Sequence, residues 1–155
     1  VAENLNLSVR RRLARLGAWL SRRAEAHNAT TFIGKLRIKT ASPRSPISSL
    51  SGGNQQKVIL ARWLSEQVRV ILLDEPTRGI DVGAKAEIYA IVRDLASQGV
   101  GVLFVSSELP EVLALADRIL VMCEGRVTGE MPSSGATEPK LLALALPHSS
   151  MEKTA

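Results

Sequence analysis

Helical and strand-like segments alternate from residue 51 onward, and this alternation most restricts the fold. Residues 51–65 and 82–97 carry apolar side chains at helical spacing, and each segment begins at or just after a residue suited to cap a helix. Residues 68–73 and 100–105 are near-continuous apolar runs, typical of strands buried on both faces. Helices that alternate with such strands predict an α/β domain with a largely parallel sheet.

Other elements are predicted on either side of this core. They are an amphipathic helix over 8–26, a short helix over 31–36, a loop over 40–49, a helix over 110–116, and a hairpin of 119–123 with 126–131. Beyond Pro132 the Ser, Gly and Pro content predicts a loosely held tail, in which 141–146 can form a short helix. We therefore expect three parts: a helical subdomain at 1–49, a core at 50–131 and a tail at 132–155.

Composition and charge narrow the class of protein. The chain is 45% apolar over 155 residues, which suits one globular domain with a core, and no apolar run approaches the ~18 residues of a membrane span. Its one cysteine excludes an internal disulfide and fits a reducing cytosol. Residues 1–47 hold ten of the 20 basic residues and two of the 15 acidic ones. A solvated helical face explains this charge; an anionic membrane surface or nucleic acid stays open, although no aromatic residues interleave the arginines.

Two short stretches can carry chemistry. Ser51, Gly52 and Gly53 open a helix, where a hydroxyl, bare backbone N–H groups and the helix dipole can together hold a phosphate. Asp74 and Glu75 end an apolar strand. A carboxylate at the tip of a buried strand costs desolvation energy unless a cation or water compensates it, so Asp74 suits Mg²⁺ and Glu75 suits an attacking water. The two stretches together predict nucleoside-triphosphate chemistry.

The wording of these stretches resembles one family. Leu50-Ser51-Gly52-Gly53-Asn54-Gln55-Gln56 resembles the signature motif of ATP-binding-cassette (ABC) ATPases, and the strand ending in Asp74-Glu75 resembles their Walker B strand. Gly79-Ile80-Asp81 resembles the D-loop, and 116–126 resembles the closing helix and hairpin. The run from Asp74 to Lys85 is similar to the second cassette of tandem ATPases for monosaccharide import of the ribose, xylose and galactose type.

This resemblance implies a fold and a set of roles. The fold would be part of a RecA-like ABC ATPase domain, with a parallel sheet core and a C-terminal hairpin, preceded by a small helical subdomain. Glu75 would be the catalytic glutamate and Asp74 the Mg²⁺ ligand. The residues at the ATP would be Ser51, Gly52, Gly53, Gln55, Asp81 and Ser107.

The sequence departs from the family in two places. A Gly-rich loop ending in Gly-Lys-Ser or Gly-Lys-Thr, the Walker A motif, occurs nowhere in the 155 residues. Because the chain also opens on Val1 in what reads as mid-domain sequence, we expect a piece of a longer protein that is inactive alone. Ser107 stands at the position of the switch histidine, which it cannot replace as a switchable cation. A helix cap at Ser106-Ser107 is compatible with either interpretation.

The resemblance also implies partners and a place in the cell. In the family's head-to-tail dimer, Ser51, Gly52 and Gly53 would complete an ATP site whose Walker motifs belong to a first cassette. Membrane-spanning permease subunits and, indirectly, a periplasmic sugar-binding protein would be further partners, at the cytoplasmic face of the bacterial inner membrane. The alternatives are a catalytically inactive truncated module and a fragment of an SMC-type DNA repair ATPase, although no nucleic acid is expected.

Overall fold

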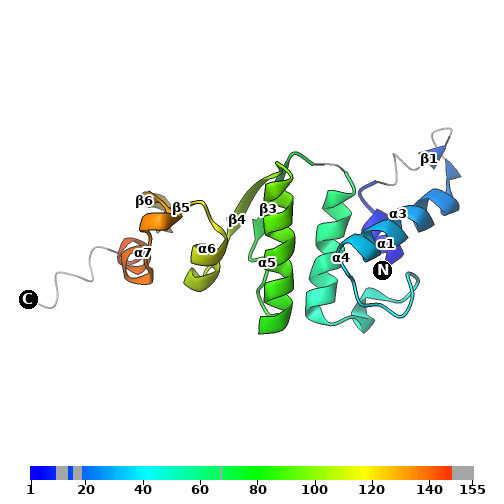
Figure 1. The fold of residues 1–155 in the computed structure, drawn as a ribbon, viewed down its shortest axis with the longest axis horizontal. Coiled ribbons are helices and arrows are strands. Elements are labelled where there is room, and N and C mark those ends of the chain that lie inside the picture. The colour runs from blue at the N-terminus through cyan, green and yellow to red at the C-terminus, as the bar shows by residue number, and fades with distance from the viewer. Residues whose placement is uncertain (10–13, 16–18, 67, 148–155) are drawn as a thin grey trace, which may run out of the picture. The chain divides into compact units, whose positions relative to one another are not determined.

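The structure is a computed structural model that describes residues 1–9, 14–15, 19–66 and 68–147. The chain forms two compact units, Val1–Val105 and Ser106–Ala155, each considered by itself below. Figure 1 shows the order of their helices and strands along the chain.

The first unit begins with two helices and a small strand pair. Helix α1 is Ala2–Asn6, strand β1 (Ala14–Arg15) pairs antiparallel with β2 (Trp19–Leu20), and α3 is Arg22–Lys35. The expected helix over 8–26 is therefore wrong, although 10–13 and 16–18 lie outside the described residues. The physical reason lies in Ser21, whose extended backbone and side chain, accepting from the Ala24 N–H at 3.3 Å, start a new helix there. The short helix expected over 31–36 is the end of α3.

The alternating core has the predicted elements. Helix α4 (Gly52–Leu64) follows a short 3₁₀ turn, η1 (Ile47–Ser49), and leads into strand β3 (Val70–Asp74). Helix α5 (Val82–Ser97) then leads into β4 (Gly101–Val105), with Gly99 at φ 85° in the turn between them. The strands pair in parallel, from Val70 opposite Gly101 to Asp74 opposite Val105. The predicted α/β architecture with a parallel sheet is confirmed.

The strands are covered on one face only, which corrects the expectation that both faces are buried. Ile71 is 5% exposed whereas Leu72 is 72% exposed, and Leu103 opposite it is 55% exposed. Side chains alternate between the faces of a strand, so these values separate a covered face from an open one. An apolar run indicates that a segment is a strand, but it does not tell how many layers cover it.

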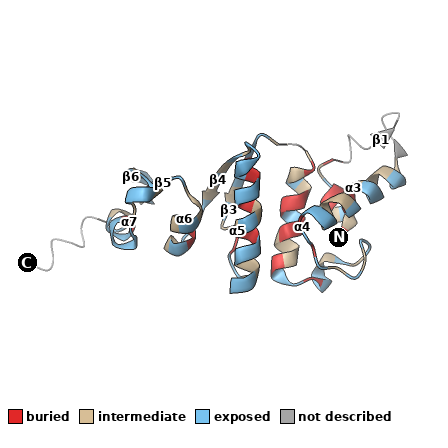
Figure 2. Ribbon diagram, viewed as in Figure 1, coloured by how far each residue is buried: buried red, intermediate tan, exposed pale blue. Residues whose placement is uncertain are grey.

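The core of the first unit holds α4 in place. Figure 2 shows buried residues in red along facing sides of α4 and α5. Leu5, Val58 and Ile88, from α1, α4 and α5, are each fully buried. Polar contacts add to this packing, because the Arg62 guanidinium in α4 donates to the backbone and side-chain oxygens of Asn4 in α1 at 2.8 and 2.7 Å. Helix α4 is therefore held by neighbouring helices on two sides.

The second unit is a hairpin flanked by two helices. Helix α6 is Leu109–Leu115, strands β5 (Arg118–Cys123) and β6 (Arg126–Pro132) form the predicted antiparallel hairpin, and α7 is Glu138–Ala145 after a short turn, η2 (Ser133–Gly135). Leu141 of α7 is 1% exposed and packs with Ile119 and Val121. The short helix expected within the tail over 141–146 is confirmed as part of α7, which begins earlier, at Glu138, and whose buried face completes the core of this unit. Residues 148–155 lie outside the described residues.

Truncating Leu141 tests whether α7 belongs to the folded unit. Leu141→Ala should lower the free energy of unfolding by about 2–4 kcal/mol, the usual result of deleting a buried leucine. Leu142→Ala is the matched control, because Leu142 is 50% exposed one position along the same helix. Thermal unfolding, with hydrogen exchange on β5 and β6, measures both. Equal effects of the two substitutions would show that α7 is not part of this core.

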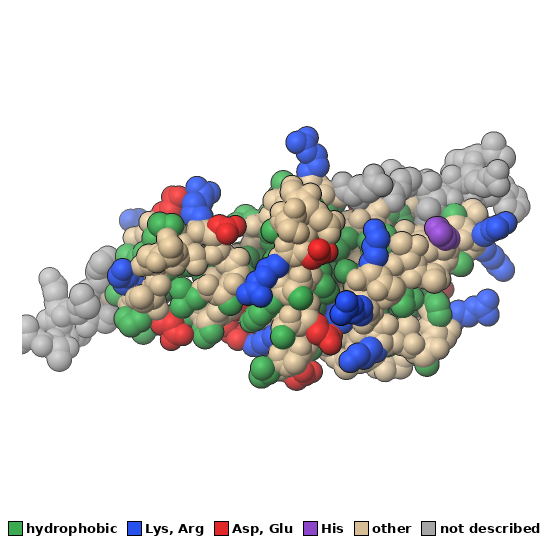
Figure 3. Space-filling view, in the orientation of Figure 1, with side chains coloured by type: hydrophobic (Ala, Val, Ile, Leu, Met, Phe, Trp, Pro, Cys, Tyr) green, Lys and Arg blue, Asp and Glu red, His purple; other side chains and the backbone are tan. Residues whose placement is uncertain are grey.

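The distribution of basic side chains over the surface indicates whether they gather into a patch. On the face in Figure 3, Lys and Arg side chains are spread over the described surface, and several lie beside Asp or Glu side chains. This arrangement is typical of solvated charges. Among the described helices, none is long and apolar enough to cross a membrane.

Candidate functional site

The N-terminus of α4 is open. Ser51 is its N-cap residue, but within the described part of the chain its side chain makes no capping hydrogen bond. Ser51 and Gly52 are both exposed. The first-turn N–H groups of a helix have no acceptor inside the helix, and with the helix dipole they favour an anion. The open end of α4 is compatible with a phosphate, and phosphate binding there stays a prediction.

Gly53 lies against α5 rather than at the surface. It is buried, and a Cβ built at Gly53 would collide with the Cβ of Ala84 in the first turn of α5. A Cβ at Gly52 would meet only the Ile80 Cγ2 at 3.3 Å and the Gly79 carbonyl at 3.8 Å. The second glycine of the pair thus has a packing role that the sequence alone does not reveal: it brings the N-termini of α4 and α5 together.

The N-terminus of α5, in contrast, is closed by its own carboxylate. Asp81 is the N-cap residue, and its Oδ1 accepts from the Ala84 N–H at 2.9 Å. The carboxylate satisfies a first-turn N–H group and places negative charge beside it. Of the two neighbouring helix ends, α4 is accordingly the one suited to an anion. Because Ala84 of α5 contacts Gly53 of α4, the N-cap residue Asp81 lies close to the N-terminus of α4.

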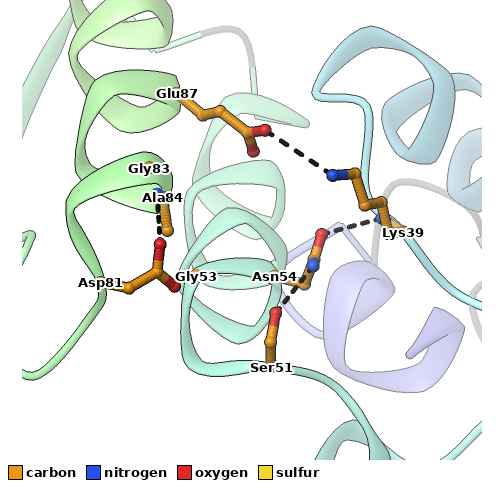
Figure 4. Close-up of a pocket in the computed structure, with 8 residues that line it drawn as sticks. All are labelled: Lys39, Ser51, Gly53, Asn54, Asp81, Gly83, Ala84 and Glu87. Carbon is orange, nitrogen blue, oxygen red and sulfur yellow. Dashed lines mark hydrogen bonds and ion pairs between the residues drawn. The ribbon is translucent and has the colours of Figure 1, made fainter.

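A pocket of about 270 Å³ lies between these helix ends and the segment before α4. Figure 4 shows its lining residues, which are Lys39, Ser51, Gly53, Asn54, Asp81, Gly83, Ala84 and Glu87. Three of the predicted site residues, Ser51, Gly53 and Asp81, therefore share one concave surface.

An ion pair between the buried Lys57 and the exposed Glu87 ties α4 to α5 beside this pocket. The Lys57 ammonium, whose side chain is 3% exposed, donates to Glu87 Oε2 at 2.5 Å and to the Arg37 carbonyl at 3.3 Å. The hydrogen bond and the charge of Lys57 hold the pKa of Glu87 below its ordinary value, while desolvation acts in the opposite direction. Lys39 Nζ approaches Glu87 Oε1 at 3.9 Å from the other side and lowers that pKa further.

Gln55 turns back onto the start of its own helix. Its Nε2 donates to the Leu50 carbonyl at 2.9 Å. The amide thus fixes the chain entering α4. In this structure the Gln55 side chain packs back onto the start of α4, and its predicted contact with ATP stays a prediction.

The carboxylates at the end of β3 have different surroundings. Asp74 is exposed, so the desolvation argument for a cation there does not hold. Glu75 is half-buried and has φ 45°, a left-handed conformation that is uncommon for a residue other than glycine. Its N–H donates to the Val105 carbonyl at 2.9 Å, which extends the β3–β4 ladder by one residue. Strained residues of this kind often occur at active sites, which supports Glu75 as a candidate.

A metal site is not preformed in the described residues, where no group of three or more His, Cys, Asp or Glu side chains comes together. The fit to Mg²⁺ therefore depends on Asp74 together with water and nucleotide oxygens, a coordination that Mg²⁺ commonly accepts.

The switch position lies in the second unit. Ser107 is exposed. The neighbouring Ser106 hydroxyl donates to Glu111 Oε2 at 2.5 Å and accepts from the Glu108 N–H at 3.0 Å. The Ser106 hydroxyl thus holds the turn before α6, whose N-cap residue is Glu108, so the helix cap expected at Ser106-Ser107 is wrong. The role of Ser107 stays a prediction.

Sequence reasoning missed Asn54, Lys57 and Glu87. Asn54 stands inside the quoted motif but was assigned no role. Lys57 could have been singled out because it lies on the apolar face of α4, between residues that pack into the core. Glu87 carries no comparable signal, since its partner is distant in the sequence.

The comparisons with known proteins agree on one family. The sequence model of the ABC transporter family matches residues 1–78. The arabinose import ATP-binding protein AraG of Pectobacterium atrosepticum is 59% identical over 146 residues, which cover 94% of this chain and 29% of that protein. The chain spans 29 to 31% of the length of this and two further curated arabinose import relatives.

Solved structures share the fold. MJ1267, an ATP-binding cassette of an ABC transporter, superposes with a TM-score of 0.72 at 22% identity, covering 94% of this chain and 62% of its own. A dimeric post-hydrolysis state of the cassette MJ0796, bound to ADP and Pi, gives a TM-score of 0.66 at 25% identity, covering 79% of this chain and 52% of that one.

Proposed function

The chain belongs to the ABC transporter family, and on this basis we propose that it is part of the ATP-binding component of a bacterial monosaccharide importer. The observation that carries the proposal is the open N-terminus of α4, where Ser51 and Gly52 are exposed beside the capped start of α5. Relatives named for arabinose import make arabinose the first sugar to test, while ribose, xylose and galactose follow from the motif wording.

In this proposal the chain contributes to an ATP-binding site in which a partner cassette makes most of the contacts with the phosphates. Ser51 and Gly52 donate to the terminal phosphate, whereas a Walker A loop on a partner cassette surrounds the rest. The dimeric cassette similar to this chain supports such an arrangement. Residues 1–49 act as the helical subdomain that docks on permease subunits, and 50–131 act as part of the ATPase core.

The second proposed site belongs to this cassette itself. Asp74 holds Mg²⁺ through water, and Glu75 orients or deprotonates the attacking water. Ser107 replaces the histidine expected there, so this site should hydrolyse ATP weakly or not at all. A cassette that contributes to one strong and one weak ATP site fits the second half of a tandem ATPase. We place this ATPase at the cytoplasmic face of the inner membrane. A periplasmic sugar-binding protein would deliver the sugar to the permease subunits.

Two substitutions test this division of roles in the assembled transporter. Ser51→Arg should abolish sugar uptake, because its side chain enters the space that the phosphate needs, whereas Glu75→Gln should reduce uptake by less than about tenfold. Uptake of labelled arabinose into cells or vesicles is the measurement. Ser97→Arg is the matched control, since Ser97 is an exposed serine at the opposite end of α5.

Complete and equal loss in Ser51→Arg and Glu75→Gln would contradict the asymmetric roles. An SMC-type DNA repair function would instead appear as DNA binding by the basic segment 1–47 that weakens steeply with salt.

A further inference from the structure

Asn54 links the Ser51 hydroxyl to the backbone of the preceding segment. Asn54 Nδ2 donates to Ser51 Oγ at 2.9 Å, and Asn54 Oδ1 accepts from the Lys39 N–H at 2.8 Å. Figure 4 shows both contacts as dashed lines among the residues that line the pocket. The amide therefore bridges the start of α4 and residue 39, 15 positions earlier in the chain.

The direction of each hydrogen bond is fixed by chemistry. A backbone N–H can only donate, so the Asn54 oxygen must face Lys39 and the NH₂ group must face Ser51. An amide NH₂ can also only donate, so the Ser51 oxygen must accept. The single hydroxyl proton of Ser51 is thereby directed away from Asn54. Among the residues described, none accepts that proton.

We propose that Asn54 is a positioning residue that orients the Ser51 hydroxyl so that its proton is available to a phosphate oxygen. This inference rests on the proposed function, because it assumes that Ser51 contacts the terminal phosphate of ATP. The orientation is set before the anion arrives, so its binding requires no rearrangement of the serine. Preorganised donors of this kind act most strongly where negative charge develops during the reaction.

The bridge also makes Ser51 sensitive to the segment before α4. Lys39 and Asn54 line the same pocket, and the Lys39 side chain approaches Glu87 on α5 at 3.9 Å. A displacement of the backbone at residue 39 would break the bond to Asn54 Oδ1 and release the amide. Asn54 thus couples the backbone at residue 39 to the orientation of the Ser51 hydroxyl.

The test is a double-mutant cycle in the complete ATP-binding protein, assembled with its membrane subunits in lipid vesicles. Asn54→Ala should lower the rate of hydrolysis at saturating MgATP by about tenfold, and Ser51→Ala by at least as much. If Asn54 acts through Ser51, the double variant should be within about twofold of Ser51→Ala alone. Gln98→Ala, an amide truncation at the far end of α5, is the control expected to keep the wild-type rate.

The cycle separates the possible failures. Wild-type activity of Asn54→Ala, or losses that multiply in the double variant, would overturn the positioning role of Asn54. Wild-type activity of Ser51→Ala would overturn the proposed function of the α4 end, and the inference with it.

A second variant keeps the proposal testable if Asn54→Ala does not fold. Asn54→Asp retains the shape and the acceptor for the Lys39 N–H, but its carboxylate can only accept a hydrogen bond and so takes the Ser51 proton. We expect a loss of at least tenfold. A wild-type rate in Asn54→Asp would overturn the proposal.

Discussion

Replacing Gly53 by alanine should destabilise the first unit by about 1–3 kcal/mol, although alanine is the better helix former. The new methyl group would collide with the Cβ of Ala84, which cannot move without shifting the backbone of α5. Because this contact joins the starts of α4 and α5, the substitution should also disturb Ser51. Thermal unfolding and sugar uptake are the two measurements.

A second-site substitution separates packing from phosphate contact at Gly53. In Gly53→Ala/Ala84→Gly the methyl group changes sides, so stability should return to within about 1 kcal/mol of the wild type. Ala84→Gly alone should cost about 1 kcal/mol from helix propensity. If uptake returns together with stability, the role of Gly53 is packing. Failure of Ala84→Gly to restore stability would contradict the described contact between the two helices.

The ion pair between Lys57 and Glu87 should give unequal effects when either partner is removed. Among the residues that the structure describes, Glu87→Ala leaves the 3% exposed Lys57 ammonium with only the Arg37 carbonyl, and we expect a loss of about 3–5 kcal/mol. Lys57→Met removes the buried charge and leaves Glu87, 47% exposed, in contact with water. That substitution should cost less. Denaturant unfolding of both variants measures the difference, and a larger loss in Lys57→Met would contradict the burial of Lys57.

The same pair predicts a dependence on pH. The folded state holds the pKa of Glu87 below its ordinary value of 4.5, so the unfolded state binds the proton more readily. The stabilisation is therefore present above pH 4.5 and is lost as pH falls through the lower pKa of the folded state. Unfolding measured between pH 6 and pH 3 should show this acid-induced loss in the wild type and a smaller one in Lys57→Met.

The sequence predicts local features of the site well. Ser51 and Asp81 mark the starts of α4 and α5, and the apolar runs mark β3 and β4, because capping and strand patterns are encoded within a few residues. The parallel pairing follows from the alternation of these elements.

Features that depend on distant residues could not be predicted in this way. The contact of Gly53 with Ala84 and the pair of Lys57 with Glu87 join residues about 30 positions apart, and no local pattern encodes them. The exposure of Asp74 depends on which layers cover the sheet.

The helix expected over 8–26 failed for a different reason. Leucines at helical spacing were given more weight than the N-cap at Ser21, whose capping hydrogen bond starts α3 in the middle of the expected helix. Within the tail, the apolar stretch 141–146 predicts the helix but not its start at Glu138. Its packing through Leu141 depends on the hairpin that it covers.

In the proposed function, the signature end of α4 completes an ATP site in which another cassette holds the phosphates. Calorimetric titration of MgATP into the 155-residue chain tests it most directly. The account predicts no saturable binding, because no Gly-rich phosphate loop occurs in the sequence. Micromolar binding at one site would show that this chain holds the phosphates itself, and would contradict the account.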